Sequence, residues 1–214
     1  MGDTPRQEPA VLHSDDFGLQ HASVEAMLSA VDRPVSSRGE PMIVRQALSA
    51  AEVNEVLRAA DHMADAYDVA YGKAHAALFM HRGGYFEQCC PELLSRLVAK
   101  MRGTALGWWT GSEEDEGELS LRCIEFHTYQ AGGGLLDVNH RDTGSIVSMS
   151  ILLADAAQMV GGRFVTWGAD GPQTHELAQG DAIVFDSEMV HNVSTLTEGI
   201  LHSLVARSDR GGEQ

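Results

Sequence analysis

Positively charged residues are scarce in this sequence. Its 214 residues include 15 Lys and Arg against 31 Asp and Glu, which gives a formal net charge of −16. The only lysines are Lys73 and Lys100, and the chain after residue 100 has six arginines against 17 acidic residues. Because a surface this negative repels phosphate groups, we expect no binding to nucleic acid or membranes. We expect a neutral or basic partner, either a peptide or a small molecule.

Cysteine is scarce too, and long apolar runs are absent. Cys89, Cys90 and Cys123 are the three cysteines, and the adjacent pair suits neither an ordinary disulfide nor a zinc knuckle, which favours a reducing compartment. Residues 1–6 lack the apolar run of a signal peptide, and no stretch approaches the roughly 18 apolar residues of a membrane-spanning helix. We therefore expect an intracellular protein, by default a cytoplasmic one. These patterns do not address the oligomeric state.

The composition, with 43% hydrophobic and 21% charged residues, is that of a globular protein, and the length suits one domain. Residues 1–45, rich in Pro, Gly, Asp and Ser, are expected to form an N-terminal arm, and residues 46–214 a single domain. Two stretches within about residues 46–110 have apolar residues at helical spacing. The first follows a capping box of Ser49 and Glu52. The second begins at Pro91 and is expected to end at Gly103.

From residue 119 the apolar pattern changes to a period of two. Short runs rich in β-branched and aromatic residues are separated by Gly, Asp and Pro, which is typical of strands. Closely spaced short strands favour a sandwich or a jelly-roll barrel. The sequence therefore predicts an α+β chain with a β-barrel core of about residues 119–207. The predicted strands are 119–129, 146–154, 164–167, 174–178, 182–185 and 200–206.

Three residues are candidate metal ligands. On an extended segment, His140 and Asp142 would present their side chains on one face, with Arg141 on the other. His191 follows Asp142 by 49 residues, just after a predicted strand. Two histidines and one carboxylate leave open coordination positions, an arrangement typical of non-haem Fe(II) oxygenases. Zinc accepts the same ligands, but structural zinc sites usually include cysteine, and none is nearby in the sequence.

Five motifs follow one another over about residues 122–205. They are Tyr129-Gln130-Ala131-Gly132, His140-x-Asp142, Gly161-Gly162-x-Phe164, Gly180-Asp181-Ala182-Ile183-Val184-Phe185 and His191-Asn192-Val193. This ordered set resembles the Fe(II)- and 2-oxoglutarate-dependent dioxygenases, specifically the prolyl-4-hydroxylase-like branch. The resemblance implies a double-stranded β-helix (jelly-roll) barrel preceded by two buttressing helices. It also implies that His140, Asp142 and His191 bind Fe(II), and that Tyr129 and Ser203 help to hold 2-oxoglutarate.

The sequence departs from the family pattern at one position. The pattern Gly-x-Arg-x-Ser on the last strand reads Gly199-Ile200-Leu201-His202-Ser203 here. Leu201 therefore occupies the position of the arginine that, in the family, pairs with the distal carboxylate of 2-oxoglutarate. Truncating one partner of such a buried pair costs about 2–5 kcal/mol. Arg163 and Arg207 are the leading candidates for a replacement cation, ahead of His127.

The resemblance implies an enzyme that uses Fe(II), 2-oxoglutarate and O2, with ascorbate as a further candidate cofactor. Its expected reaction is the hydroxylation of a C–H bond, with a peptidyl residue such as proline as the expected substrate. Leu201 leaves two alternatives open. One is a catalytically impaired or binding-only protein that has lost the 2-oxoglutarate anchor, and the other is a metal-dependent oxygenase that uses another cosubstrate.

Overall fold

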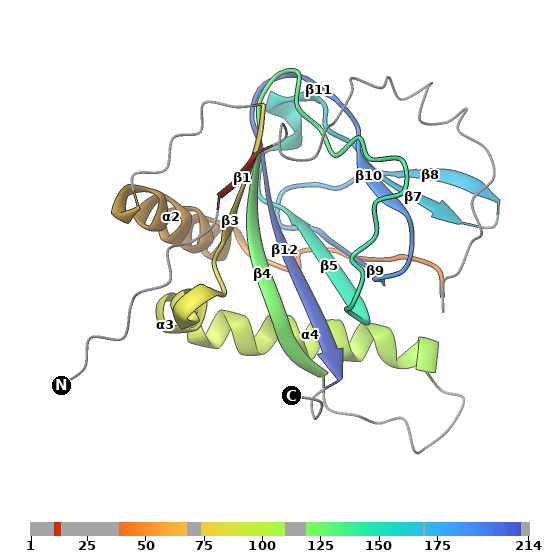
Figure 1. The fold of residues 1–214 in the computed structure, drawn as a ribbon, viewed down its shortest axis with the longest axis horizontal. Helices are drawn as coiled ribbons and strands as arrows, with labels where there is room; N and C mark the ends of the chain where they lie inside the picture. The colour runs from red at the N-terminus through yellow and green to blue at the C-terminus, as the bar shows by residue number, and fades with distance from the viewer. Residues whose placement is uncertain (1–10, 14–38, 68–73, 110–118, 169, 211–214) are drawn as a thin grey trace.

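The fold combines antiparallel sheets with helices that cover one side of the largest sheet (Figure 1). The computed structural model describes residues 11–13, 39–67, 74–109, 119–168 and 170–210. In this part of the chain, a seven-stranded sheet packs against a three-stranded sheet, and a third sheet has two short strands. The prediction of an α+β chain is confirmed at this level.

The large sheet has the strand order β1-β3-β4-β12-β5-β9-β2, and the small sheet has the order β10-β7-β8. The strands of the large sheet are β1 (Val11–His13), β3 (His75–Phe79), β4 (Leu119–Tyr129), β12 (Leu201–Arg210), β5 (Val147–Leu152), β9 (Ala182–Asp186) and β2 (Met42–Val44). The small sheet contains β10 (His191–Val193), β7 (Phe164–Gly168) and β8 (Gly171–His175). The two-stranded sheet pairs β11 (Leu196–Glu198) with β6 (Val160–Gly161).

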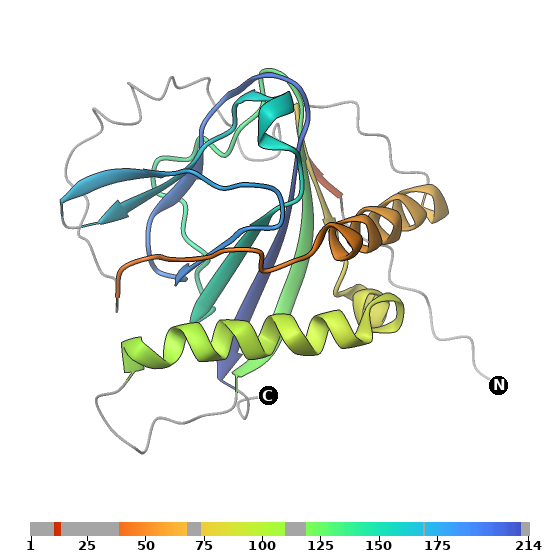
Figure 2. The ribbon, with the colours of Figure 1, turned by 180° about the vertical axis from the view of Figure 1, so that it is seen from behind.

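The helices cover one face of the large sheet (Figure 2). They are α2 (Ala50–Ala66), α3 (Tyr85–Cys89) and α4 (Pro91–Trp109), with the short 3₁₀ turn η2 (Arg82–Gly84) just before α3. A second 3₁₀ turn, η4 (Ala156–Gln158), lies between β5 and β6. Val56 of α2 and Leu97 of α4 are fully buried in one apolar cluster with Ile124 of β4. None of the described helices is long and apolar enough to cross a membrane.

The opposite face of the large sheet points toward the small sheet. Because successive side chains of a strand alternate between faces, Ile124 and Phe126 of β4 face the helices while Glu125 and His127 line a cavity on the other side. The central pair is β4 and β12, which are hydrogen-bonded along almost their full lengths, with Leu201 opposite Tyr129. These two strands therefore place a row of polar side chains inside the molecule.

Several predicted elements are confirmed. The strand predicted at 119–129 has those bounds in β4, and β5, β7, β9 and β12 lie within one to four residues of their predicted ends. The capping box is present: Ser49 Oγ accepts a hydrogen bond from the backbone N–H of Glu52, whose carboxylate accepts one from the N–H of Ser49. Strand β8 is displaced toward the N-terminus from its predicted range of 174–178.

The predicted end of the second helix is wrong. Helix α4 continues through Gly103 to Trp109. A helical glycine costs about 1 kcal/mol relative to alanine. Here the flanking residues Met101 and Ala105 are both fully buried against the sheet, and this packing outweighs the local preference of Gly103.

Two strands of the large sheet come from the segment expected to be an arm. Strand β1 pairs with β3, and β2 pairs with β9 at the sheet edge. The carboxylate of Asp181, in the Gly180-Asp181 motif, accepts hydrogen bonds from Gln46 N–H at 2.9 Å and from Arg45 at 2.6 Å. Described parts of residues 1–45 are thus tied to the rest of the fold.

We predict that Ser49→Ala lowers the free energy of unfolding by about 1 kcal/mol, because the first turn of α2 loses its N-cap acceptor. Urea denaturation should show a lower midpoint with an unchanged slope. Ser95→Ala, an exposed serine inside α4 that bonds only the preceding turn, is the matched control and should change the value by less than about 0.5 kcal/mol. Equal losses in both variants would contradict a capping role for Ser49.

Candidate metal centre

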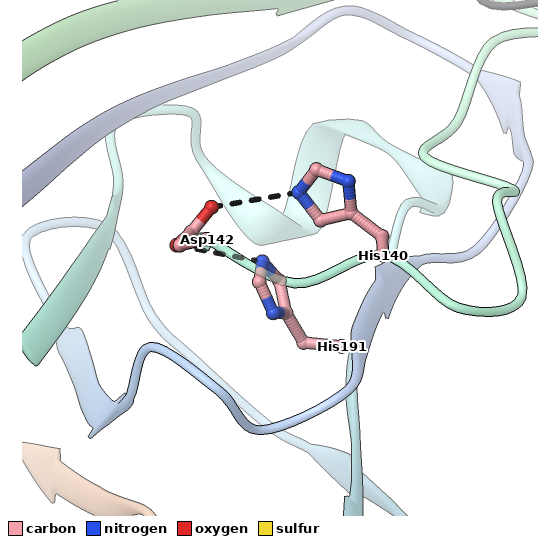
Figure 3. A group of neighbouring side chains, drawn as sticks. All are labelled: His140, Asp142 and His191. Atoms are coloured by element: carbon pink, nitrogen blue, oxygen red, sulfur yellow. Dashed lines mark ion pairs between the residues drawn. The ribbon is translucent and has the colours of Figure 1, made fainter. Parts of the chain in front are cut away.

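His140, Asp142 and His191 converge on one point, as expected from the sequence (Figure 3). The ligand atoms of all three lie within 4.8 Å of one another. His140 Nε2 is 3.5 Å from Asp142 Oδ1, and His191 Nε2 is 3.7 Å from Asp142 Oδ2. His191 begins β10, whereas His140 and Asp142 lie between β4 and β5, outside any strand. The three donors can therefore hold one metal ion from one side.

Backbone hydrogen bonds, rather than strand geometry, position the His140–Asp142 segment. The N–H of Asp142 donates to the carbonyl of Ser187 at 2.9 Å, and the N–H of His191 donates to the carbonyl of His140 at 3.2 Å. His140 and Asp142 therefore direct their side chains to the same point, as expected, although they do not lie on a strand. These contacts join a loop before β5 to the turn after β9.

A second layer of contacts fixes the ligand side chains. Ser148 Oγ donates to Asp142 Oδ2 at 2.5 Å and lies 3.0 Å from Ser187 Oγ. His191 Nδ1 is 3.0 Å from the carbonyl oxygen of Met189. Because a carbonyl can only accept, Nδ1 carries the proton, and the lone pair of Nε2 faces Asp142. This is the tautomer required for metal binding through Nε2.

The protonation states also suit a metal. Burial alone would raise the pKa of Asp142, but His191, His140, Arg207 and Ser148 together hold it well below its ordinary value. Burial lowers the pKa of His191 to about 4, against a smaller opposing effect of Asp142. At neutral pH the site therefore contains an anionic carboxylate and a neutral imidazole. Metal ions bind these forms without displacing protons.

The three donors line a cavity of about 320 Å³ between the two sheets. Aromatic rings surround His191: Phe185 lies with its centroid 4.6 Å away, and Phe164 stacks at 5.6 Å. Farther from the ligands, His75 stacks on Tyr129 with 4.2 Å between the centroids. These rings give the site apolar walls that exclude water from much of its surface.

A chain of polar contacts leads from the stacked rings to Asp142. His75 Nε2 lies 2.9 Å from His127 Nδ1, and His127 Nε2 lies 3.1 Å from Glu125 Oε2. The other Glu125 oxygen accepts a hydrogen bond from Arg207, whose Nη1 is 3.5 Å from Asp142 Oδ1. Burial opposes the ionisation of Glu125, but His127 and Arg207 outweigh it and lower its pKa to about 2. Glu125, Arg207 and Asp142 therefore form a buried ionic group.

The residues predicted to bind a cosubstrate do not share one environment. Tyr129, Ser203 and Arg207 line the metal cavity. Arg207 Nε is buried without a hydrogen-bond partner among the described residues. Arg163 lies outside this cavity, on an adjoining pocket, where it forms an ion pair with the exposed Glu176.

Leu201 belongs to the adjoining pocket and not to the metal cavity. This pocket also contains Ser203 and the apolar side chains Leu152, Met159 and Leu177. Leu201 is 3% exposed and packs in one apolar cluster with Tyr129. The guanidinium that the family pattern would place here has no counterpart at this position.

Two site residues were missed in the sequence. Ser148 lies between the fully buried Val147 and Met149 in β5. A polar residue inside a strand that is buried on both faces could have indicated a site residue from the sequence. His75 offered no such signal, because its strand, His-Ala-Ala-Leu-Phe, lacks β-branched residues.

We predict that Glu125→Gln lowers the free energy of unfolding at pH 7 by on the order of 3 kcal/mol, since Glu125 titrates near 4.5 when unfolded and near 2 when folded. A carboxyl with a depressed pKa stabilises the fold above its unfolded value, so the difference from wild type should shrink as pH falls from 4.5 toward 2. Urea unfolding at several pH values measures it. The exposed Glu198→Gln serves as the control. A difference that does not change with pH would contradict the ionic role of Glu125.

Comparisons with known proteins identify the fold. No protein-family model and no curated protein sequence matches this chain. Among solved structures, a 2OG-Fe(II) oxygenase family oxidoreductase from Burkholderia pseudomallei has a TM-score of 0.59 at 17% identity, over 79% of this chain and 84% of its own. A prolyl-4-hydroxylase from Pseudomonas putida has a TM-score of 0.58 at 20% identity, over 80% and 93% of the two chains.

A third similar structure catalyses a different reaction. The non-heme alpha ketoglutarate dependent epimerase SnoN from nogalamycin biosynthesis has a TM-score of 0.57 at 18% identity, over 81% of this chain and 78% of its own. At such identities the likeness concerns the fold, which hosts more than one reaction. The chain has the fold of the 2OG-Fe(II) oxygenases.

Proposed function

We propose that this chain is a non-haem Fe(II) oxygenase that activates O2 with a 2-oxo acid cosubstrate, 2-oxoglutarate being the one used by proteins of similar fold. The observation that carries the proposal is the convergence of His140, Asp142 and His191 inside a cavity, with the Asp142 carboxylate ionised and the His191 imidazole neutral. The proposal includes a double-stranded β-helix buttressed by α2 and α4, within a single catalytic domain of residues 46–214 whose large sheet is extended at its two edges by β1 and β2 from the preceding segment.

The donor set fits Fe(II). Two imidazoles and one carboxylate on one side of an ion leave positions for a chelating 2-oxo acid and O2. The bound metal and cosubstrate would supply the oxidising chemistry, in which one oxygen atom enters the substrate C–H bond and the other enters the acid formed, with release of CO2. The overall reaction joins substrate, O2 and 2-oxo acid to give hydroxylated substrate, CO2 and an acid one carbon shorter.

The chain's own residues position and protect this site. Ser148 holds Asp142 in place, and Met189 holds His191 in the tautomer that presents Nε2. Phe164 and Phe185 shield the imidazole from water. Arg207, between Glu125 and Asp142, balances part of the negative charge that remains inside the protein.

The proposed substrate is a peptidyl residue, with proline as the first candidate. The similar fold of the Pseudomonas putida prolyl-4-hydroxylase supports this choice. The cavity of about 320 Å³ can accept a side chain of that size. The net charge of −16 favours a neutral or basic peptide over an acidic one.

Leu201 supports a second candidate, a binding-only protein that retains the metal site but does not turn over a 2-oxo acid. The two functions differ in one measurable property. The enzyme consumes O2 and 2-oxo acid in a 1:1 ratio when a substrate is present, whereas the binding-only protein consumes neither.

We predict that Fe(II) and a 2-oxo acid, mixed with the protein without oxygen, produce the weak visible absorption of a bidentate iron chelate. His191→Ala should abolish this absorption because one of the three ligands is lost. His62→Ala, an exposed histidine of α2, is the matched control and should retain it. An unchanged band in His191→Ala would remove the metal-site assignment, and the absence of a band with every 2-oxo acid tested would favour the binding-only protein.

We predict a smaller effect for Ser148→Ala. Without its hydrogen bond Asp142 is less constrained, so Fe(II) affinity should fall by about 10- to 100-fold. Isothermal titration under anaerobic conditions measures the affinity. The exposed Ser120→Ala variant should bind like wild type. Wild-type affinity in Ser148→Ala would show that Asp142 is held by its backbone alone.

A further inference from the structure

The pocket beside the metal cavity allows a more specific statement about the cosubstrate. The two spaces share wall residues, among them Ser150, Phe164 and Ser203. A 2-oxo acid whose oxygen atoms face the metal ligands therefore has this pocket as adjoining space for the other end of the molecule. The chemical character of the pocket then determines which end groups bind well.

Most side chains that line the pocket are apolar. His175 also lines it, but its Nε2 lies 2.7 Å from Thr166 Oγ1, and burial lowers the pKa of His175, which disfavours its cationic form. Leu152, Met159, Leu177 and Leu201 contribute its aliphatic surface, while hydroxyl groups come from Ser150 and Ser203. The packing around Leu201 is close, because a Cβ atom added at Gly162 would lie 2.7 Å from its Cδ1. The pocket volume is about 50 Å³. One water molecule needs roughly 10–15 Å³ of this kind of volume, so the pocket has room for about four groups of the size of a water molecule or a methylene. This corresponds to a short aliphatic tail.

Arg163 is the one cation among the described residues that line this pocket, and it is already paired. Its guanidinium forms an ion pair with Glu176, and the side chains of Arg163 and Glu176 are 49% and 73% exposed. A carboxylate bound there would compete with Glu176 in contact with solvent, where ion pairs contribute little. Arg163 is therefore a poor equivalent of the buried arginine of the family pattern.

Arg207 lies away from this pocket, although its Nε has no hydrogen-bond partner among the described residues. It lies six residues beyond Leu201 on β12, which is about 20 Å along the strand, and it lines the metal cavity but not the apolar pocket. Its guanidinium contacts Glu125 and Asp142. A distal carboxylate at Arg207 would be the third carboxylate beside this one guanidinium.

We propose that this site selects a 2-oxo acid with a short apolar tail over 2-oxoglutarate, with Leu201 as the residue that determines the preference. The inference rests on the proposed function and specifies its cosubstrate. A carboxylate in this pocket would lose its hydration without gaining a paired cation, which is unfavourable. An aliphatic tail would instead remove apolar surface from water. Branched 2-oxo acids of five or six carbons have the corresponding size.

The test compares 2-oxo-4-methylpentanoate with 2-oxoglutarate by anaerobic titration of the Fe(II)-loaded protein, following the visible absorption band. We expect the wild type to bind 2-oxo-4-methylpentanoate at least about 10-fold more tightly, which is 1.4 kcal/mol. Equal or tighter binding of 2-oxoglutarate would overturn the inference and leave the proposed function intact. If neither acid produces the absorption band, both the inference and the proposed function are overturned.

Two variants test the role of Leu201. Leu201→Arg restores the family pattern, and we expect it to tighten 2-oxoglutarate binding by about 30-fold or more while weakening 2-oxo-4-methylpentanoate. Ile200→Arg adds the same charge at the neighbouring residue, which is 53% exposed, and should change neither affinity. The same shift in both variants would assign the effect to net charge and overturn the role of Leu201.

If Leu201→Arg does not fold, Leu201→Gln supplies the second variant, because it keeps the approximate size and adds no charge. It should weaken 2-oxo-4-methylpentanoate and leave 2-oxoglutarate no tighter than in wild type. Wild-type affinity of Leu201→Gln for the apolar acid would show that the tail does not contact this residue, contrary to the proposal.

Discussion

The ionised carboxylate of Asp142 is 3% exposed, and a buried charge of this kind is stable only when other groups compensate for it. Several features of the fold provide this compensation. Ser148 donates a short hydrogen bond to Asp142, and the guanidinium of Arg207 lies 3.5 Å from it, while Nε2 of His140 and of His191 lie within 3.7 Å of its two oxygens. The same contacts leave the ligand atoms directed at one point. Stabilising the anion and preparing a metal site are therefore one structural requirement.

The alternation of side chains along β4 and β12 links this site to the rest of the molecule. On one face of the large sheet, Ile124 and Phe126 join the helices in the apolar core. On the other face, the intervening Glu125 and His127 reach toward Asp142 through Arg207. A one-residue slip between the two strands would exchange these faces, so the register that builds the core also builds the site.

The sequence was informative where a residue's role depends on local spacing. Periodicity predicted β4 and most of the later strands, and the Ser49–Glu52 pair predicted the start of α2. The three candidate metal ligands, of which the first and last are 51 positions apart in the sequence, lie together in the fold as expected. That prediction drew on several ordered motifs, since His-x-Asp alone is a common pattern.

The sequence was less informative where a role depends on distant contacts. Gly103 signalled a helix end that packing of Met101 and Ala105 overrides. Strand β3 has weak β propensity and exists because it pairs with β4. Arg163 and Arg207 looked equivalent as candidate cations in the sequence. In the structure Arg163 pairs with Glu176, whereas Arg207 lies beside Glu125 and Asp142. Only the fold distinguishes the two arginines.

The central claim is that His140, Asp142 and His191 bind one iron ion. The most direct measurement is anomalous scattering at the iron edge from crystals grown with Fe(II) in the absence of oxygen. The account predicts a single iron peak enclosed by His140 Nε2, the Asp142 carboxylate and His191 Nε2, and no peak there in Asp142→Ala crystals. Iron bound elsewhere, or at the same place in the variant, would contradict it.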